Sequence, residues 1–103
     1  MSNDSEAFRK TIADVDRRVR ELAGAGEDIV LRTDAPDTAT WDRGHYRGTL
    51  TLHTAEKLPR LSLSLHTGTQ MHPDPVQIGL YDADVVELIA EPIAGLLSGR
   101  VTL

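Results

Sequence analysis

The chain has 103 residues, which is the length of one domain, so we expect a single domain spanning residues 1–103. Hydrophobic residues make up 40% of it and charged residues 26%, a balance that excludes an intrinsically disordered chain and a membrane-embedded one. The absence of cysteine excludes disulfides, thiol nucleophiles and Cys-ligated metals, and the net charge of −5 argues against nucleic-acid binding.

The sequence gives no sign of export or membrane insertion. No apolar stretch approaches the roughly 20 residues that span a bilayer. Residues 1–6 are polar and lack the basic and apolar regions of a secretory signal peptide. We therefore expect a cytoplasmic protein that contacts no membrane. Nine arginines against two lysines are common in proteins from GC-rich bacterial genomes, so we expect a bacterial source.

The first segment predicts an amphipathic helix that ends at the glycines of residues 24–26. Its hydrophobic residues recur at spacings of four and three and form one stripe, made of Phe8, Ile12, Val15, Val19 and Leu22. Charged residues four positions apart are expected to pair, as Glu6–Lys10, Asp14–Arg18, Asp16–Arg20 and Arg17–Glu21. The stripe could form a coiled coil, but two to three heptads are short for one, so docking on a sheet is favoured.

Residues 28–33 are β-branched and apolar and predict a short strand. Residues 34–45 predict a loop, because turn formers such as Pro36, Asp37 and Gly44 are frequent in it. At about twelve residues it is longer than ordinary connections, which is typical of functional or poorly ordered loops. Its Trp41 is the only tryptophan of the chain, and we expect it to be exposed.

The clearest pattern lies in residues 46–54 and 60–66, where apolar and polar residues alternate and predict two half-buried strands. Residues 56–59 suit a four-residue hairpin loop. A register that keeps the leucines on one face pairs Leu52 with Leu63 and Leu50 with Leu65. In that register, His53 faces Ser62 and His66 faces Thr49.

The other face of this hairpin is polar and consists of Arg47, Thr49, Thr51, His53, Arg60, Ser62, Ser64 and His66. It belongs to the only basic part of the chain. Residues 46–66 carry a net charge of +2, against 0 for residues 1–23, −3 for residues 24–45 and −4 for residues 67–103.

Residues 67–75 predict a second loop, and residues 76–81 alternate and predict another strand. A C-terminal helix is expected to follow, with Asp82 or Asp84 as its cap and Gly99 at its end. Its apolar positions are Val85, Leu88, Ile89, Ile93, Leu96 and Leu97. Pro92 either kinks this helix or separates two elements, and we favour the kink.

These elements predict an α+β fold, a small two-layer sandwich in the order α-β-β-β-β-α. It contains an N-terminal helix, a three- to four-stranded, mainly antiparallel sheet and a C-terminal helix. Both helices are expected to cover the leucine face, which leaves the polar face open.

The four histidines do not predict a metal site. His45 and His53 lie about 26 Å apart on one extended segment, and His53 and His66 about 13 Å apart. His66 and His72 could meet if the chain folds back, but they lack a third ligand. We expect neither a metal nor another cofactor.

We expect a small non-enzymatic interaction module with an accessory, inhibitory or regulatory role. It would bind a protein partner, or itself as a homodimer, through the open face and the Trp41 loop. The residues expected to bind are Trp41, Arg43, Arg47, His53, Arg60 and His66.

Two alternatives stay open. In the first, a small enzyme uses His53 or His66 as a general base beside a strand hydroxyl, although no acid on that face orients either histidine. In the second, nucleic acid binds through Arg47, Lys57 and Arg60.

Overall fold

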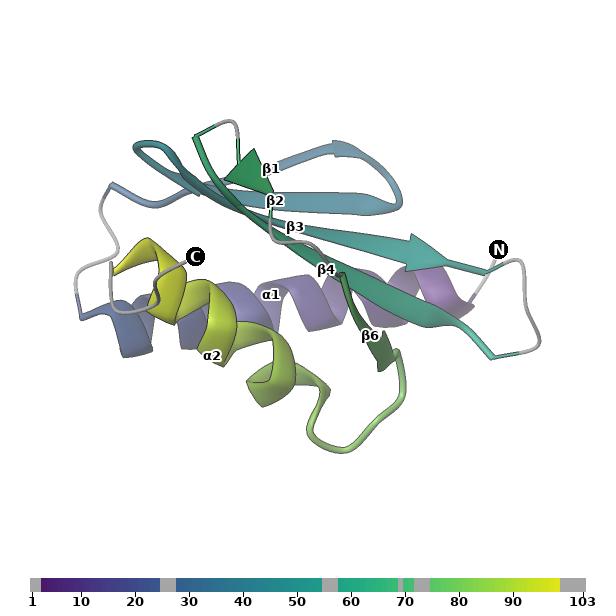
Figure 1. Ribbon diagram of the computed structural model, residues 1–103. Coiled ribbons are helices and arrows are strands. Elements are labelled where there is room, and N and C mark those ends of the chain that lie inside the picture. The colour runs from purple at the N-terminus through teal and green to yellow at the C-terminus, as the bar shows by residue number, and fades with distance from the viewer. Residues whose placement is uncertain (1–2, 25–27, 55–57, 69, 72–74, 99–103) are drawn as a thin grey trace.

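A computed structural model describes residues 3–24, 28–54, 58–68, 70–71 and 75–98. Two helices, α1 (Asn3–Ala23) and α2 (Val85–Leu97), lie on one face of a sheet (Figure 1). The sheet contains β1 (Val30–Ala35), β2 (Thr38–Arg43), β3 (Tyr46–His53), β4 (Arg60–Thr67), β5 (Gln70–Met71) and β6 (Val76–Gly79). The predicted α+β sandwich is confirmed, with six strands among the described residues where three to four were expected.

All strand pairs of the sheet are antiparallel, and the order begins β1-β2-β3-β4. Two short strands share the far edge of β4. The strand β6 pairs with residues 60–63 and β5 with residues 66–67. The edge of β1 that faces away from β2 is therefore one end of the sheet.

The predicted loop at residues 34–45 is wrong, because residues 38–43 form β2 and residues 34–35 belong to β1. Tight turns at residues 36–37 and 44–45 connect β2 to its neighbours, and the second contains Gly44 with a φ of 61°. Residues 38–42 alternate between hydroxyl or charged residues and apolar ones, and Ala39 and Trp41 are fully buried. This alternation forms a half-buried strand despite the turn formers on both sides of it.

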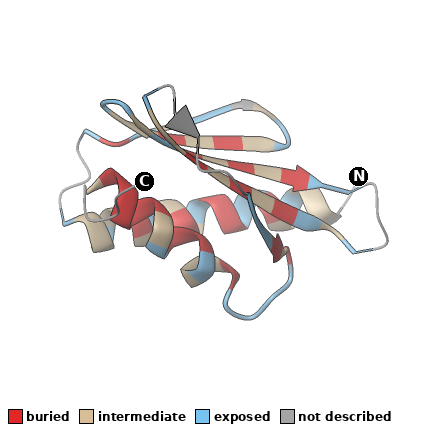
Figure 2. Cartoon of the chain, in the orientation of Figure 1, coloured by how far each residue is buried: buried red, intermediate tan, exposed pale blue. Residues whose placement is uncertain are grey.

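The predicted β3–β4 hairpin is confirmed, but its predicted register is wrong by two residues. Leu52 lies opposite Leu61 and Leu50 opposite Leu63, because the connection runs from residue 54 to residue 59 and is longer than expected. Since the shift is an even number of residues, the leucines stay on the helix side and the polar residues on the other side. The alternating burial of both strands is visible in Figure 2.

The hydrophobic stripe of α1 faces the core, as expected. Phe8, Ile12, Val15 and Val19 are buried, and Leu22 packs against them. The stripe packs within the chain's own core, against α2 and the sheet, so it is not the seam of a coiled coil.

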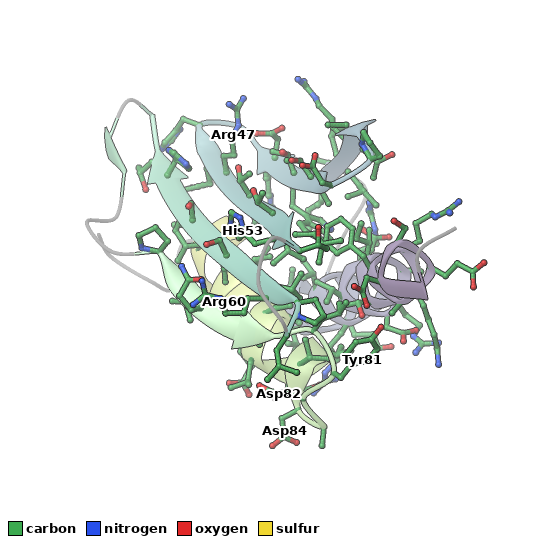
Figure 3. All side chains as sticks on the ribbon, turned by 90° about the vertical axis from the view of Figure 1, so that its right-hand side faces the viewer. Arg47, His53, Arg60, Tyr81, Asp82 and Asp84 are labelled. Carbon is green, nitrogen blue, oxygen red and sulfur yellow. The ribbon has the colours of Figure 1, made fainter. Side chains whose placement is uncertain are left out.

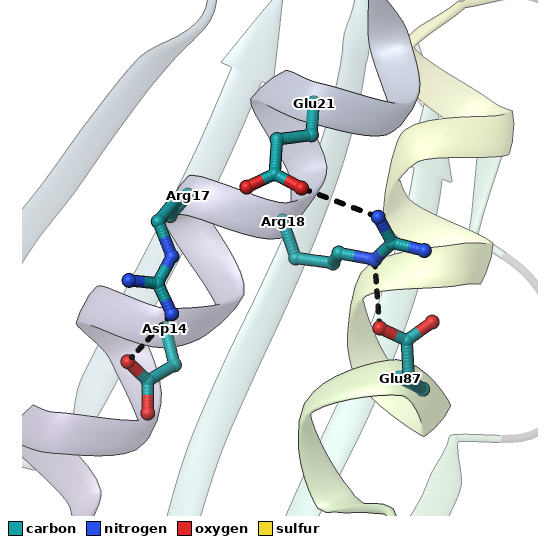
Figure 4. A network of polar contacts seen from close by, with 5 residues as sticks. All are labelled: Asp14, Arg17, Arg18, Glu21 and Glu87. Atoms are coloured by element: carbon teal, nitrogen blue, oxygen red, sulfur yellow. Dashed lines mark hydrogen bonds and ion pairs between the residues drawn. The ribbon is translucent and has the colours of Figure 1, made fainter.

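Arg18 connects the two helices. Its Nε donates to Glu87 of α2 at 2.7 Å, and its Nη1 lies 3.2 Å from Glu21 (Figure 4). Both contacts favour the charged guanidinium, and the bond to Glu87 contributes most to raising the pKa of Arg18. Asp14 pairs with Arg17 at 3.5 Å, so the predicted pairs Asp14–Arg18 and Arg17–Glu21 are wrong.

A second contact joins the start of α1 to the loop before α2. The hydroxyl of Tyr81 donates to Asp4 Oδ1 at 2.7 Å, which raises the pKa of Tyr81 because the carboxylate stabilises the protonated phenol. In the same loop, Asp82 Oδ2 accepts from the Gly79 backbone N–H at 3.2 Å. Asp84, one of the two predicted alternatives, is the N-cap residue of α2, but its side chain makes no cap hydrogen bond.

The helix α2 is continuous from Val85 to Leu97 with Pro92 inside it, so the alternative of two separate elements is wrong. Most of its residues are buried, and the exception among the predicted apolar positions is Leu88, which is 49% exposed. The predicted end at Gly99 lies outside the described residues.

Close packing between α2 and the sheet requires a glycine on β3. Gly48 is on the helix side, between Trp41 of β2 and Leu65 of β4. A Cβ at this position would lie 3.0 Å from Cγ1 of Ile93, which is fully buried, so the two side chains would be in tighter contact than is usual. The absence of a side chain therefore sets the distance between α2 and the sheet.

We predict that Gly48→Ala lowers the free energy of unfolding by about 1–3 kcal/mol, because the added methyl overpacks the core. Urea denaturation followed by tryptophan fluorescence measures this loss. The control is the double variant Gly48→Ala/Ile93→Ala, whose loss should be smaller than the sum of the two single losses. Additive losses would show that the two residues do not compete for the same space.

Candidate interaction surface

Among the described elements, no helix covers the second face of the sheet, which we call the open face (Figure 1). The register arranges its side chains in rows that run across the strands. The first row is Val30, Asp42, Arg47 and His66, and the second is Arg32, Thr40, Thr49 and Ser64. The third is Thr38, Thr51, Ser62 and Gln77, and the fourth is His53 and Arg60.

Hydroxyl side chains occupy the middle two rows of the open face. Ser62 accepts from Gln77 Nε2 at 2.8 Å, and Thr38 donates to Asp37 at 3.3 Å. The other four hydroxyls make no side-chain hydrogen bond within the described part of the chain; they belong to Thr40, Thr49, Thr51 and Ser64. Each of these groups is able to donate and to accept.

Asp42 is the one acidic side chain that the register places on the open face among the described side chains. Its side chain is 14% exposed, and Oδ1 accepts from Arg47 Nε at 2.7 Å. Oδ2 is buried, lies 3.7 Å from Arg32 Nε and has no hydrogen bond within the described residues. Asp42 thus holds Arg47 in place, and Arg47 projects from the sheet away from both helices (Figure 3).

Both histidines of the open face lie opposite arginines. His66 faces Arg47 and His53 faces Arg60, so the predicted pairs with Thr49 and Ser62 are wrong. No acidic side chain of the described part hydrogen bonds to either histidine. Within the same part, no group of three or more His, Asp or Glu side chains is placed to hold a metal ion.

One end of the open face is hollowed. The hollow has a volume of about 160 Å³, and its lining includes Asp42, His45, Arg47 and His66. The turn residues Gly44 and Gly68 complete it, and a hydrogen bond of 2.7 Å from Gly68 N to His45 O holds the two turns together. Its size fits a single side chain or a small anion.

Two of the six predicted binding residues lie on the helix side. Trp41 is fully buried and donates from Nε1 to Asp16 Oδ1 at 3.1 Å. Arg43 donates to Asp28 at 2.9 Å and to the carbonyl of Leu97, at the end of α2, at 3.2 Å. The prediction of an exposed loop around Trp41 is therefore wrong, and Trp41 offers no surface to a partner in this structure.

The other four predicted binding residues lie on the open face; they are Arg47, His53, Arg60 and His66. Sequence reasoning missed Asp42, because residues 34–45 were interpreted as a loop. The alternation of Thr38, Ala39, Thr40, Trp41 and Asp42 is the signal that places Asp42 on the open face.

Searches of protein-family models, curated proteins and solved structures find no match to this chain. As far as the described residues go, neither helix combines the length and the hydrophobicity that crossing a bilayer requires.

We predict that Trp41→Phe lowers the free energy of unfolding by about 1–3 kcal/mol, because it removes the bond to Asp16 and part of the packed volume. Urea denaturation followed by circular dichroism measures the loss, since the variant has no tryptophan. In the wild-type protein, acrylamide should quench Trp41 only weakly until the chain unfolds. Strong quenching of the folded protein would contradict the buried position.

We predict that Asp42→Asn lowers the free energy of unfolding by about 1 kcal/mol, because it removes the charge that Arg47 and Arg32 share at a partly exposed site. Thermal or urea denaturation at low and at high salt measures the effect. The difference between variant and wild type should shrink as salt screens the ion pairs. A difference that does not change with salt would indicate that the charge has no part in it.

Proposed function

We propose that this protein is a small interaction module whose open face binds an acidic surface of a partner protein. The observation that carries the proposal is the composition of the open face. Among the described side chains of this face, three arginines, Arg32, Arg47 and Arg60, outnumber the one aspartate, although the whole chain has a net charge of −5. Complementary charge steers association and selects the partner.

The hydroxyl rows support the same proposal. Threonine and serine side chains are short, so a partner's backbone is able to approach the sheet closely. Thr40, Thr49, Thr51 and Ser64 leave donors and acceptors for that partner. Among the open-face residues whose side chains are described, Val30 is the one large apolar residue, so we expect a polar, wet and reversible interface.

Arg47 is the residue we expect to contribute most to binding. Asp42 fixes its Nε, which leaves the rest of the guanidinium directed toward a partner beside the hollow. A held arginine loses less conformational entropy on binding than a free one. An acidic side chain of the partner would enter the hollow between Arg47, His45 and His66.

The test is affinity capture from cells that express the gene, quantified by mass spectrometry, with the wild-type chain and two variants of the open face. Arg47→Glu reverses the charge, and Thr49→Glu places an acid in the hydroxyl rows. Each should reduce capture of the acidic partner about tenfold, because like charges then oppose each other. Capture of the partner should also weaken as the ionic strength rises.

The control is Arg17→Glu, the same charge reversal on α1, where the side chain is 73% exposed. It should capture as much of the partner as the wild type does. Thermal unfolding shows whether each variant is folded. The same captured set for all four chains would contradict the proposal, and so would a wild-type homodimer, seen by light scattering, that the open-face variants separate into monomers with no other protein bound.

A further inference from the structure

A groove runs between α1 and the free edge of the sheet, on the helix side and away from the open face. Its volume is about 750 Å³, which lies within the range of ligand pockets. Its apolar lining comes from Ile12 and Ala13 of α1, from Leu31 and Ala35 of β1, and from Pro36.

The groove borders the edge of β1 that pairs with no other described strand. An exposed edge presents backbone N–H and C=O groups to an added strand. Alternate side chains of such a strand would point into the groove beside Leu31, and the others would point toward the open face beside Arg32. The edge and the groove therefore fit an extended segment of chain.

Charges at the groove define that segment further. Asp16 also lines it, but its carboxylate already accepts from Trp41 and from Arg20. Arg9 lines it as well and makes no hydrogen bond or ion pair within the described part of the chain. On the other side of the edge, Arg32 is 56% exposed and only 3.7 Å from a carboxylate. Among the side chains described beside the edge, Arg9 and Arg32 are the two left to meet a ligand, and both are positive.

The ladder between β1 and β2 is interrupted, because the register shifts between Arg32 and Ala35. Regular backbone along β1 is therefore confined to residues 30–32. A bulge near a sheet edge opposes long strand pairing. This favours a short peptide over a continuous sheet formed with a second copy of the chain.

We propose that the groove between α1 and β1 binds a short extended peptide that alternates apolar and acidic residues. The peptide adds to the edge of β1 at residues 30–32. Its apolar side chains fill the groove, one acidic residue pairs with Arg9 at the rim, and another lies beside Arg32. This site is separate from the proposed binding of a partner to the open face and does not depend on it.

The experiment begins with a phage-displayed library of random decapeptides, selected on the immobilised full chain. A synthetic peptide of the most enriched sequence then gives dissociation constants by fluorescence anisotropy. We expect the enriched sequences to alternate apolar and acidic residues. Amide hydrogen exchange followed by NMR should show new protection at residues 30–32 when the peptide binds.

Three variants of α1 locate the site. Ala13→Glu places a charged side chain in the groove and should weaken binding at least about tenfold. Arg9→Gln should weaken it about three- to fivefold, the effect of one exposed ion pair. The matched control Lys10→Gln removes the same charge at an exposed neighbouring position outside the groove and should leave the affinity unchanged.

Each contrary result overturns the proposal. One such result is a selection that enriches no sequence or enriches basic sequences. Another is a peptide that binds Ala13→Glu with the same affinity as the wild type. A dimer in the absence of peptide that Ala13→Glu separates would instead assign the groove to a second copy. None of these variants lies on the open face, so the groove can fail while the open-face proposal holds, and the reverse.

Discussion

The carboxylate of Asp16 joins α1 to the sheet layer through a buried tryptophan. It accepts from Trp41 Nε1 at 3.1 Å and from Arg20 Nε at 3.0 Å, and Arg20 also donates to the carbonyl of Ile29 at 3.1 Å. One acid on α1 thereby fixes the indole of β2 and, through Arg20, the chain that enters β1. A buried indole N–H without a partner costs free energy, and the bond to Asp16 avoids that cost.

The position of Trp41 in turn determines how the rest of the core packs. The indole lies next to Gly48 on the neighbouring strand, where the missing side chain admits Ile93 of α2. A large residue and the smallest one therefore lie side by side on the helix face of the sheet. Both helices pack against that face, and the opposite face of the sheet therefore carries hydroxyl and charged side chains.

Sequence alone predicted the architecture and the polarity of each face, because alternation with a period of two is independent of register. The leucines of residues 50–52 and 61–65 are buried as expected, and the Asp16–Arg20 pair is present. Alternation could not determine which residues of the hairpin lie opposite each other. A register shift of two residues leaves every side chain on the same face, so the register depends on the length of the connection. The expected Glu6–Lys10 pair is absent.

The error at β2 has a different physical origin and more effect on function. Turn formers flank the strand closely, and local propensity is a weak guide where tertiary packing buries the intervening residues. Because Trp41 and Arg43 were assigned to a loop, both were expected to bind a partner, whereas Trp41 supports the core and Arg43 joins the end of α2 to Asp28. Asp42, between them, went unnoticed.

The same strand explains why the open face is suited to recognition. Successive residues of β2 point to opposite sides, so the contacts that fix Trp41 and Arg43 on the helix side also fix Asp42 on the other, and with it Arg47. Neighbouring side chains in the hydroxyl rows are spaced as the strands are, about 4.8 Å apart. Threonine has a restricted χ1, and short side chains lose little entropy when a partner binds. A partner would therefore meet a surface whose geometry the core has already set, and most of the ordering cost of binding would fall on the partner.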